Sequence, residues 1–401
     1  MIGKTNAMAK ASGEDKVIDL SMQDVYGNPI RQTTANCYVV TKPGVYKFPL
    51  VFGNAITNGE VNSAAFTNNG GTNSRDFVDR NNTIISTPFI EQNIELAGYD
   101  EDKIFGAEIS NYDTEEVFAG VGIIGGEECK YMQVEISSVP SEGANGVISV
   151  VNGYRESLWS WHIWVWPHDL TPVEITNSTG VKYGIMPVNL ATKLDYGTVY
   201  GSGTSGYKNW FYQFGRPTPM LLPASYSSTS RHEIGRFAIN GAAYYCDSFV
   251  EPYTFFKEDT NGNWFKDYPS QSYNMWDAAC TAKGNSDNDV VKTVYDPCPV
   301  GWKMPNGNVF TGFSIDNVVG SFSNGWKFKR YSGDTKGVFF PAAGRITSAG
   351  SVSLVGSNVG VWLSSAYSTT RVYMLQATSS KVQTQTTAAR AYGFSVRPVQ
   401  D

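Results

Sequence analysis

The sequence has no apolar run long enough to cross a bilayer and no cluster of basic residues. A transmembrane helix needs about 18 or more consecutive apolar residues, and no such stretch occurs in this chain. Nucleic-acid phosphates are bound by clustered Lys and Arg, whereas the 31 basic residues here are dispersed and are outnumbered by 37 acidic ones. We therefore expect neither a membrane span in this chain nor a nucleic-acid partner.

Cysteine, histidine and recognisable catalytic motifs are also scarce. The five cysteines are too few for a disulfide framework, and neither they nor the three histidines have the spacing of a metal site. The glycines of Gly120 to Gly125 fit a dinucleotide fingerprint, but the residues that follow indicate a hairpin turn and a strand instead of a helix. We expect a non-enzymatic protein with no metal and no cofactor. A Cys/His or Ser/His/Asp site stays open, because such residues need not be close in sequence.

The low share of charged residues is typical of a secreted β protein, whereas the N-terminal residues carry no export signal. Charged residues make up 17% of the chain, below the share of about a quarter in ordinary globular proteins. The first residues, MIGKTNAMAKASGED, lack the apolar segment of a signal peptide and a lipobox cysteine. We expect that an export signal was removed or that the chain is an excised piece, and that residues 1–14 are a flexible N-terminus.

What the chain does contain is short apolar runs separated by turn residues, which is the pattern of a β-rich protein. Strands are expected in the first half at 17–20, 37–40, 45–52, 83–85, 104–109, 117–124, 131–136 and 146–151. No helical period is sustained there, which favours an antiparallel β-sandwich. In the second half, strands are expected at 337–340, 360–364, 372–377, 381–386 and 392–399, with a short helix at 275–282.

The length of the chain favours two domains. Pro167 and the polar segment that follows it indicate a boundary near residues 167–180. We expect a β-sandwich domain at 15–170 and a second domain at 180–401, each folding independently.

The tract Leu158 to Trp166 carries four tryptophans within eight positions. These indoles would form an exposed platform for stacking on sugars, or they would fill the core of a strand at the domain junction. The second interpretation is favoured, because large aromatic side chains are mostly buried.

Two sets of sequence blocks resemble families of bacterial surface proteins. In the second half the blocks are, in order, Gly184 to Leu190, Tyr212 to Arg216, Tyr295 to Pro305, Phe340 to Arg345, Trp362 to Ser365 and Gly393 to Arg397. Their content and order resemble the Fibrobacter succinogenes major paralogous domain. The first half resembles the domain that often precedes it in fimbrillin-type surface proteins of the Bacteroidetes, through Thr34 to Val40, Gly44 to Asn54 and Trp159 to Trp164.

The resemblance implies secretion, a location at the cell surface or in an extracellular fimbrium, and adhesion, often as a fimbrial tip or accessory subunit. The partners it implies are other fimbrial subunits and a glycan or host protein ligand. Gly301 to Pro305, followed by a Trp-Ser-Ser strand, is also similar to the α+β C-type-lectin-like fold and to formylglycine-generating enzymes. Two alternatives therefore stay open: a structural pilus subunit without a ligand, and an enzyme on a formylglycine-generating-enzyme-like fold.

The same resemblance bears on the cysteines. The family tends to end in Val-Arg-Cys-Val, whereas this chain has Pro398 in place of the cysteine that would pair with Cys298. In an oxidising compartment, Cys280 and Cys298 are then the expected disulfide, with Cys246 as a competing partner. Two buried free thiols are the alternative.

Ligand binding is expected on the loops at 244–276 and 306–336, because loops between scaffold strands carry recognition. Aromatic rings and amides can stack on and hydrogen-bond to a sugar or a peptide, and the candidate residues of this kind are Trp264, Tyr253, Phe256, Asn261, Asn263 and Tyr268. Trp264 is expected to be exposed at a loop tip, since the turn-forming residues 259–263 precede it. The alternative is that most of these rings belong to the core.

Overall fold

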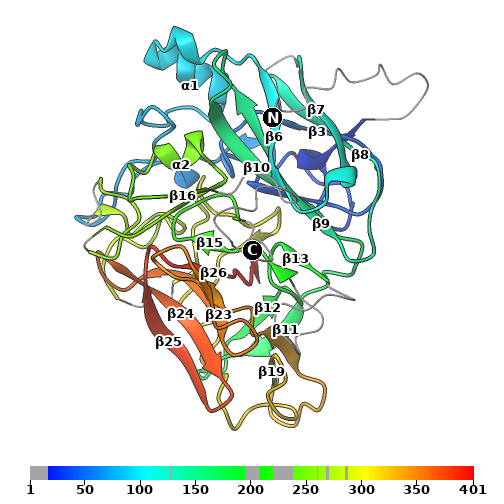
Figure 1. The fold of residues 1–401 in the computed structure, drawn as a ribbon, viewed down its shortest axis with the longest axis vertical. Helices are drawn as coiled ribbons and strands as arrows, with labels where there is room; N and C mark the ends of the chain where they lie inside the picture. Colours follow the sequence, from blue (N-terminus) through cyan, green and yellow to red (C-terminus); the bar gives the residue numbers. More distant parts are fainter. Residues whose placement is uncertain are drawn as a thin grey trace.

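The computed structural model describes residues 17–126, 129–194, 208–220, 238–259, 261–267, 271–284 and 288–401. Strands account for 37% and helices for 7%, which confirms the β-rich architecture expected from the sequence. In Figure 1 the first half, coloured blue to teal, lies at the top, and the orange and red strands near the C-terminus lie at the bottom. No helix in the described ranges is long and apolar enough to cross a bilayer.

The first half contains two four-stranded sheets in a sandwich-like arrangement. One sheet has the order β1 (Ile18–Asp19), β3 (Gly44–Pro49), β8 (Tyr131–Ile136) and β7 (Phe118–Ile124). The other has the order β2 (Cys37–Val40), β10 (Ser157–Val165), β9 (Ala144–Val151) and β6 (Gly106–Tyr112). Phe48 of β3 meets Trp161 of β10 edge-on, with ring centroids 5.2 Å apart, so the two inner faces share one core.

Both sheets differ from the purely antiparallel arrangement that the sequence predicts. At one edge of each sheet, β1 pairs with β3 and β2 pairs with β10 in parallel. No hairpin fixes the relative direction of β2 and β10, because they are far apart in the chain. The remaining short elements of this half are the pair β4 (Ile56–Thr57) and β5 (Glu60–Val61) and the 3₁₀ turns η1 (Leu20–Met22), η2 (Ser63–Ala65), η3 (Asp100–Asp102) and η4 (Glu115–Val117).

The helix α1 (Ile90–Ala97) lies in the first half, where no helix was expected. Ile90 and Ile94 are one turn apart and both are buried, so one apolar side anchors the helix. Gly98 ends it in the left-handed conformation, with φ 76°, and its N–H donates to the carbonyl of Glu95. A helix of 8 residues is too short to show a sustained helical period in the sequence.

The tryptophan tract forms β10 and is buried along its whole length, which confirms the interpretation as core. On one side, Trp161 packs against the neighbouring sheet. On the other side, the indole N–H of Trp164 donates to the carbonyl of Thr192 at 3.0 Å, and His162 stacks on Trp210 with ring centroids 6.1 Å apart. Both faces of the strand are covered, so large side chains are buried on both sides of it.

The second half is built from several small sheets. One larger sheet has the order β11 (Val173–Thr176), β12 (Lys182–Ile185), β27 (Val399–Gln400) and β18 (Trp302–Lys303). A second has the order β15 (Tyr212–Gln213), β26 (Gly393–Phe394), β21 (Arg345–Ile346) and β22 (Val352–Ser353). The third consists of β23 (Val359–Ala366), β24 (Arg371–Thr378) and β25 (Lys381–Ala389). Its strand pairs are β13 (Thr192–Lys193) with β14 (Lys208–Asn209), β16 (Ala238–Asn240) with β17 (Thr254–Phe256), and β19 (Gly325–Phe328) with β20 (Val338–Pro341).

Helix is sparse in this half. The described part has the short helix α2 (Asp247–Val250). The helix expected at 275–282 does not form, since Asp277 instead makes a β-bridge with Lys292. The C-type-lectin-like assignment of this half stays a prediction.

The sequence blocks of the second half meet in space although they are far apart in the chain. The buried guanidinium of Arg397, in the last block, donates to the carbonyls of Met186 at 3.0 Å and Pro187 at 2.7 Å, in the first block. It also lies over the ring of Phe340, 4.1 Å from the centroid. A buried cation needs such acceptors, so these blocks serve as the framework of this half.

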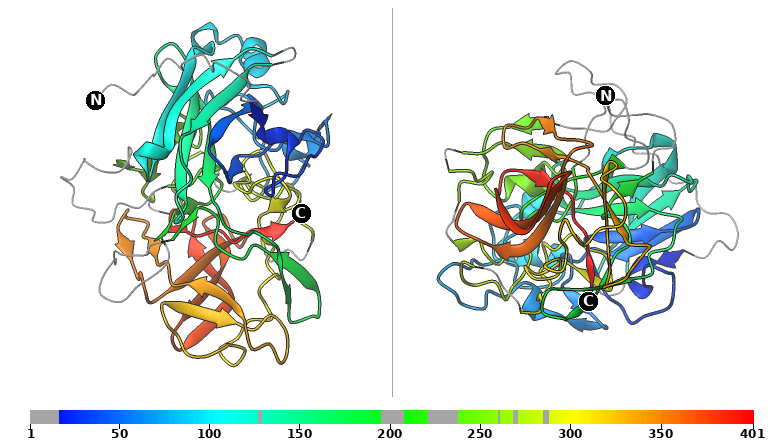
Figure 2. Two further views of the ribbon diagram at one scale, coloured as in Figure 1. Left: turned by 90° about the vertical axis from the view of Figure 1, so that its right-hand side faces the viewer. Right: turned by 90° about the horizontal axis from the view of Figure 1, so that it is seen from below.

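A single hydrophobic core cluster extends across the expected boundary at 167–180. Trp159 of β10 stacks on Phe249 of α2, with ring centroids 4.7 Å apart. The side-chain amide of Asn36 donates to the carbonyls of Val294 at 2.6 Å and Asp296 at 2.8 Å. Figure 2 shows the two halves in direct contact, with the C-terminal end at the level where they meet. The two halves thus share part of their core, whereas the sequence predicts that they fold independently.

Candidate functional site

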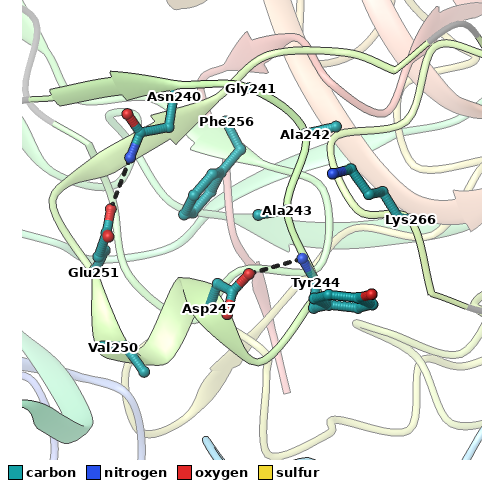
Figure 3. Close-up of a pocket in the computed structure, with 10 residues that line it drawn as sticks. All are labelled: Asn240, Gly241, Ala242, Ala243, Tyr244, Asp247, Val250, Glu251, Phe256 and Lys266. Atoms are coloured by element: carbon teal, nitrogen blue, oxygen red, sulfur yellow. Dashed lines mark hydrogen bonds between the residues drawn. The ribbon is translucent and has the colours of Figure 1, made fainter.

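A pocket of about 360 Å³ lies in the second half beside α2 (Figure 3). We call it the α2 pocket. It is lined by residues of β16, β17, α2 and the segments that flank them: Asn240, Gly241, Ala242, Ala243, Tyr244, Asp247, Val250, Glu251, Phe256 and Lys266.

Strand pairing brings the walls of the α2 pocket together. β16 and β17 run parallel, with Asn240 opposite Phe256, and α2 lies in the connection between them. A third segment joins through Ala243, whose N–H donates to the carbonyl of Trp264 at 3.0 Å and whose carbonyl accepts from the N–H of Lys266 at 2.8 Å. The pocket is therefore closed by pairings between segments that are not adjacent in the chain.

Two carboxylates face the α2 pocket, each held through one oxygen. Oε2 of Glu251 accepts from the side chains of Asn240 at 3.1 Å and Thr254 at 2.8 Å. Oδ2 of Asp247 accepts from the main-chain N–H of Tyr244 at 2.9 Å. In the part of the chain that the structure describes, the second oxygen of each group has no hydrogen-bond partner. Each carboxylate thus keeps a fixed orientation and an acceptor available for a ligand.

The apolar part of the pocket consists of two rings with different surroundings. Phe256 is buried and stacks on Trp264, with ring centroids 5.9 Å apart and 18° between the planes, so it forms a rigid wall. Tyr244 is 60% exposed, and its ring points outward at the edge of the pocket (Figure 3). The ammonium group of Lys266, an exposed side chain, completes the rim.

The side chain of Arg216 binds several main-chain carbonyl groups around α2. Its buried guanidinium donates to the carbonyls of Pro252 at 2.9 Å, Glu251 at 3.3 Å and Ser248 at 3.4 Å, and also to that of Thr254. Burial lowers the pKa of Arg216 to about 10, so it remains charged at neutral pH. One charged group thus orders the C-terminal end of α2 and the start of β17.

The predicted ligand-binding residues do not form one site, because they differ in burial and in whether they line the α2 pocket. Phe256 lines the α2 pocket, while Tyr253, half-buried, and Asn261, exposed, are not among the lining residues. Asn263 is fully buried, and both polar atoms of its side chain lack a partner in the described ranges. Tyr268 lies outside the described residues.

Trp264 is fully buried, so the expectation of an exposed loop tip was wrong. Its indole N–H donates to the carbonyl of Phe214 at 2.9 Å. A turn does precede it, with the N–H of Asn261 donating to the side chain of Asp259 at 2.8 Å. The neighbouring bridge between Ala243 and Phe265 then leads the chain into the core instead of away from it.

Of the residues that line the pocket, only Phe256 is among those predicted from the sequence to bind a ligand. Tyr244 opens the loop range in which binding was expected, but it was not singled out. Asp247 and Glu251 carry no local motif, and 37 acidic residues in the chain offer no basis for selecting two. Only the pairing of β16 with β17 places these side chains around one cavity.

The expected disulfide is not formed in the structure. Cys280 and Cys298 are both buried free thiols, which corresponds to the alternative. Cys280 packs in a small cluster with Tyr273 and Ala366, whereas Cys298 belongs to the large core cluster. Burial raises the pKa of the Cys280 thiol to about 11.

The structure also brings together a Cys/His pair that the sequence left open. Sγ of Cys37 lies 3.2 Å from Nδ1 of His162, and Nε2 of His162 lies 2.9 Å from Oδ1 of Asn145. This order of groups resembles a thiol catalytic triad. However, all three residues are fully buried. Burial raises the pKa of the Cys37 thiol and lowers the pKa of His162 to about 3, so both stay neutral and no thiolate forms.

Grouped metal ligands are not found: no three His, Cys, Asp or Glu side chains of the described ranges are placed to hold an ion. The α2 pocket offers an accessible and varied set of groups, and we take it as the candidate site. Comparison with known proteins found no matching family model, no matching curated protein and no matching solved structure.

Proposed function

We propose that this chain is a non-enzymatic adhesion protein of the cell surface that binds a glycan in the α2 pocket. The observation that carries the proposal is the combination of groups in that pocket. An exposed tyrosine ring, two oriented carboxylates and an ammonium group surround one cavity.

Each of these groups matches a part of a sugar. Hydroxyl groups of a sugar can donate to the available oxygens of Asp247 and Glu251 and accept from the ammonium of Lys266. The apolar C–H face of a sugar ring can pack on the exposed ring of Tyr244. A volume of about 360 Å³ suits one or two sugar units better than a folded protein surface. The ligand would then be the terminal part of a glycan.

The cellular role rests on the sequence resemblance. The second half resembles the Fibrobacter succinogenes major paralogous domain, and the first half resembles the domain that often precedes it in fimbrillin-type surface proteins. This resemblance supports secretion, a position at the cell surface and assembly with other fimbrial subunits. Within such an assembly, a subunit that binds a glycan belongs at the tip or at an accessory position. A purely structural pilus subunit would have no use for the α2 pocket, and an enzyme would turn over the bound sugar.

The test is binding of the full chain to an array of mannose-, galactose-, fucose-, N-acetylglucosamine- and sialic-acid-terminated glycans. We expect Tyr244→Ala and Glu251→Gln each to weaken binding about tenfold, or roughly 1.4 kcal/mol, with little change in melting temperature. Tyr154→Ala is the matched control, because this tyrosine is 75% exposed and is not a lining residue of the pocket. If the wild-type chain binds no glycan, or if all three variants bind equally, the proposal is wrong.

A further inference from the structure

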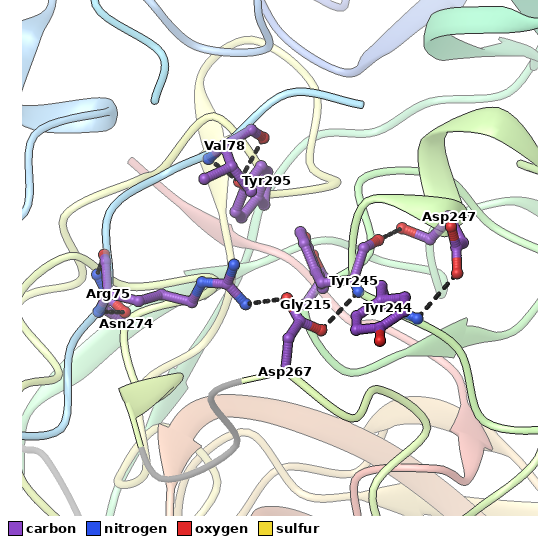
Figure 4. A network of polar contacts seen from close by, with 10 residues as sticks. Arg75, Val78, Gly215, Tyr244, Tyr245, Asp247, Asp267, Asn274 and Tyr295 are labelled. Carbon is purple, nitrogen blue, oxygen red and sulfur yellow. Dashed lines mark hydrogen bonds and ion pairs between the residues drawn. The ribbon is translucent and has the colours of Figure 1, made fainter. Parts of the chain in front are cut away.

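The residues that line the α2 pocket belong to the second half, but a residue of the first half fixes the backbone on two sides of it. Nη1 of Arg75 lies 3.2 Å from Oδ2 of Asp267. The other oxygen of the same carboxylate, Oδ1, accepts from the main-chain N–H of Tyr245 at 2.7 Å. Figure 4 shows this series of contacts from Arg75 through Asp267 to Tyr245 and Tyr244.

The position of Asp267 explains why this contact matters for the pocket. Asp267 follows Lys266 in the chain, and Tyr245 follows Tyr244, so one carboxylate holds the backbone next to two lining residues. Tyr245 is fully buried, and its hydroxyl donates to the carbonyl of Gly215 at 2.6 Å. With Tyr245 fixed in this way, the backbone at Tyr244 and the backbone at Lys266 are held in a defined spacing.

Arg75 is itself held firmly. Its main-chain N–H donates to Oδ1 of Asn274 at 3.1 Å, and the side-chain amide of Asn274 donates to the carbonyl of Arg75 at 2.9 Å. Its guanidinium also lies over the ring of Tyr245, 5.4 Å from the centroid. The side chains of Arg75 and Asp267 are only 6% and 9% exposed, so their ion pair is shielded from solvent.

A second contact between the halves supports α2 itself. Phe249, in the middle of α2, stacks on Trp159 of β10 at 4.7 Å and meets Tyr245 edge-on at 5.3 Å. The helix therefore contacts the first half through apolar rings. The segments that contain Tyr244 and Lys266 contact it through the ion pair of Arg75 with Asp267. In Figure 1, α2 lies beside β10 instead of beside the strands near the C-terminus.

We propose that Arg75 is a positioning residue of the α2 pocket, so that ligand binding by the second half depends on the first half. The role of the pocket as a glycan site rests on the proposed function, whereas the positioning by Arg75 does not. Removing one partner of a buried ion pair leaves the other charge uncompensated. Without Arg75, the carboxylate of Asp267 turns toward water and releases the N–H of Tyr245. The pocket then loses its preorganisation, and affinity falls.

The experiment compares Arg75→Gln, Arg75→Lys and Arg80→Gln in the full chain. Arg80 is the matched control, because its ion pairs with Asp102 and Glu156 stay within the first half. The first measurement is hydrogen exchange of peptides covering residues 243–251 without ligand, and the second is binding to the glycan array described above. We expect Arg75→Gln to speed exchange there about tenfold and to weaken binding about tenfold. Arg75→Lys restores part of both, and Arg80→Gln changes neither.

The outcomes separate the two proposals. Unchanged exchange of residues 243–251 in Arg75→Gln overturns the positioning role. Faster exchange combined with no glycan binding by the wild-type chain supports the positioning role and removes the proposed function. If Arg75→Gln loses its cooperative unfolding transition, Asp267→Asn replaces it, since it removes the charge but keeps an acceptor for Tyr245. Faster local exchange is expected again, and its absence overturns the proposal.

Discussion

At the scale of single residues, the carboxyl group of Asp277 makes the stability of the protein depend on pH. It is fully buried, and burial raises the pKa of its carboxyl group from 3.8 to about 6. Oδ1 accepts the N–H groups of Ala279 and Val291, both at 3.0 Å, while Oδ2 has no partner in the described ranges. The folded state therefore binds this proton more tightly than the unfolded chain. The resulting stabilisation is complete below about pH 4 and is lost as the pH rises through about 6.

We predict that Asp277→Asn removes this pH dependence, because an amide is uncharged and can still accept both N–H groups. The variant should be more stable than the wild type at pH 7 by up to roughly 3 kcal/mol and equally stable near pH 4. Urea unfolding of both proteins between pH 4 and pH 7 gives the difference. Other carboxyl groups titrate in both proteins and cancel in this comparison. A difference that does not change with pH would contradict the prediction.

At the scale of elements, two glycines with positive φ differ in the reason why a side chain is disfavoured. At one the reason is the backbone conformation alone, and at the other it is also the lack of space. Gly98 ends α1 at φ 76°, and a Cβ there would meet no atom within 4 Å. Gly53 follows the loop after β3 at φ 39°, and a Cβ there would overlap the carbonyl oxygen of Val294, in the other half of the molecule. Both positions disfavour a side chain through the backbone, but only Gly53 also lacks the space for one.

We predict that Gly98→Ala costs about 1 kcal/mol of unfolding free energy, the usual penalty for a side chain in the left-handed conformation. Gly53→Ala should cost roughly two to three times more, because the contact between the halves must open to admit the methyl group. Chemical denaturation of the two variants and the wild type measures both values. An equal loss of unfolding free energy in the two variants would contradict the prediction, because it would show that the contact at Val294 can open without destabilising the protein.

At the scale of the whole molecule, the shared core bears on how the two halves fold. The sequence predicts that residues 15–170 and 180–401 fold independently. In the structure, Trp159 packs against Phe249 and Tyr295, and the hydroxyl of Tyr295 donates to the carbonyl of Val78 at 2.7 Å. Separation of the halves would expose these rings and leave the buried polar groups without partners.

We therefore predict that residues 180–401 alone do not unfold cooperatively, in contrast to the full chain. Calorimetry of the full chain and of each half, together with binding of a dye for exposed apolar surface, gives the measurement. A cooperative transition in both isolated halves would instead support the independence that the sequence suggests. It would also weaken the inferred dependence of the α2 pocket on Arg75.

The sequence by itself determined the local features of this protein. The alternation of short apolar runs and turn residues predicted the β-rich architecture, and the bounds of β2 and β8 agree with those of the structure. The density of tryptophan between 158 and 166 was enough to favour a buried strand, because so much apolar surface is rarely left in water. These properties depend on neighbouring residues and on composition, which the sequence contains directly.

Tertiary structure alone decided the direction of the edge strands, the burial of Trp264 and the location of the α2 pocket. The turn before Trp264 predicted an exposed ring, but the pairing of Ala243 with Phe265 leads that ring into the core. Asp247, Glu251 and Lys266 become one site only because β16 pairs with β17 and residues 264–266 pair with Ala243. Such pairings join segments across the chain, and their free energy depends on contacts that no local pattern records.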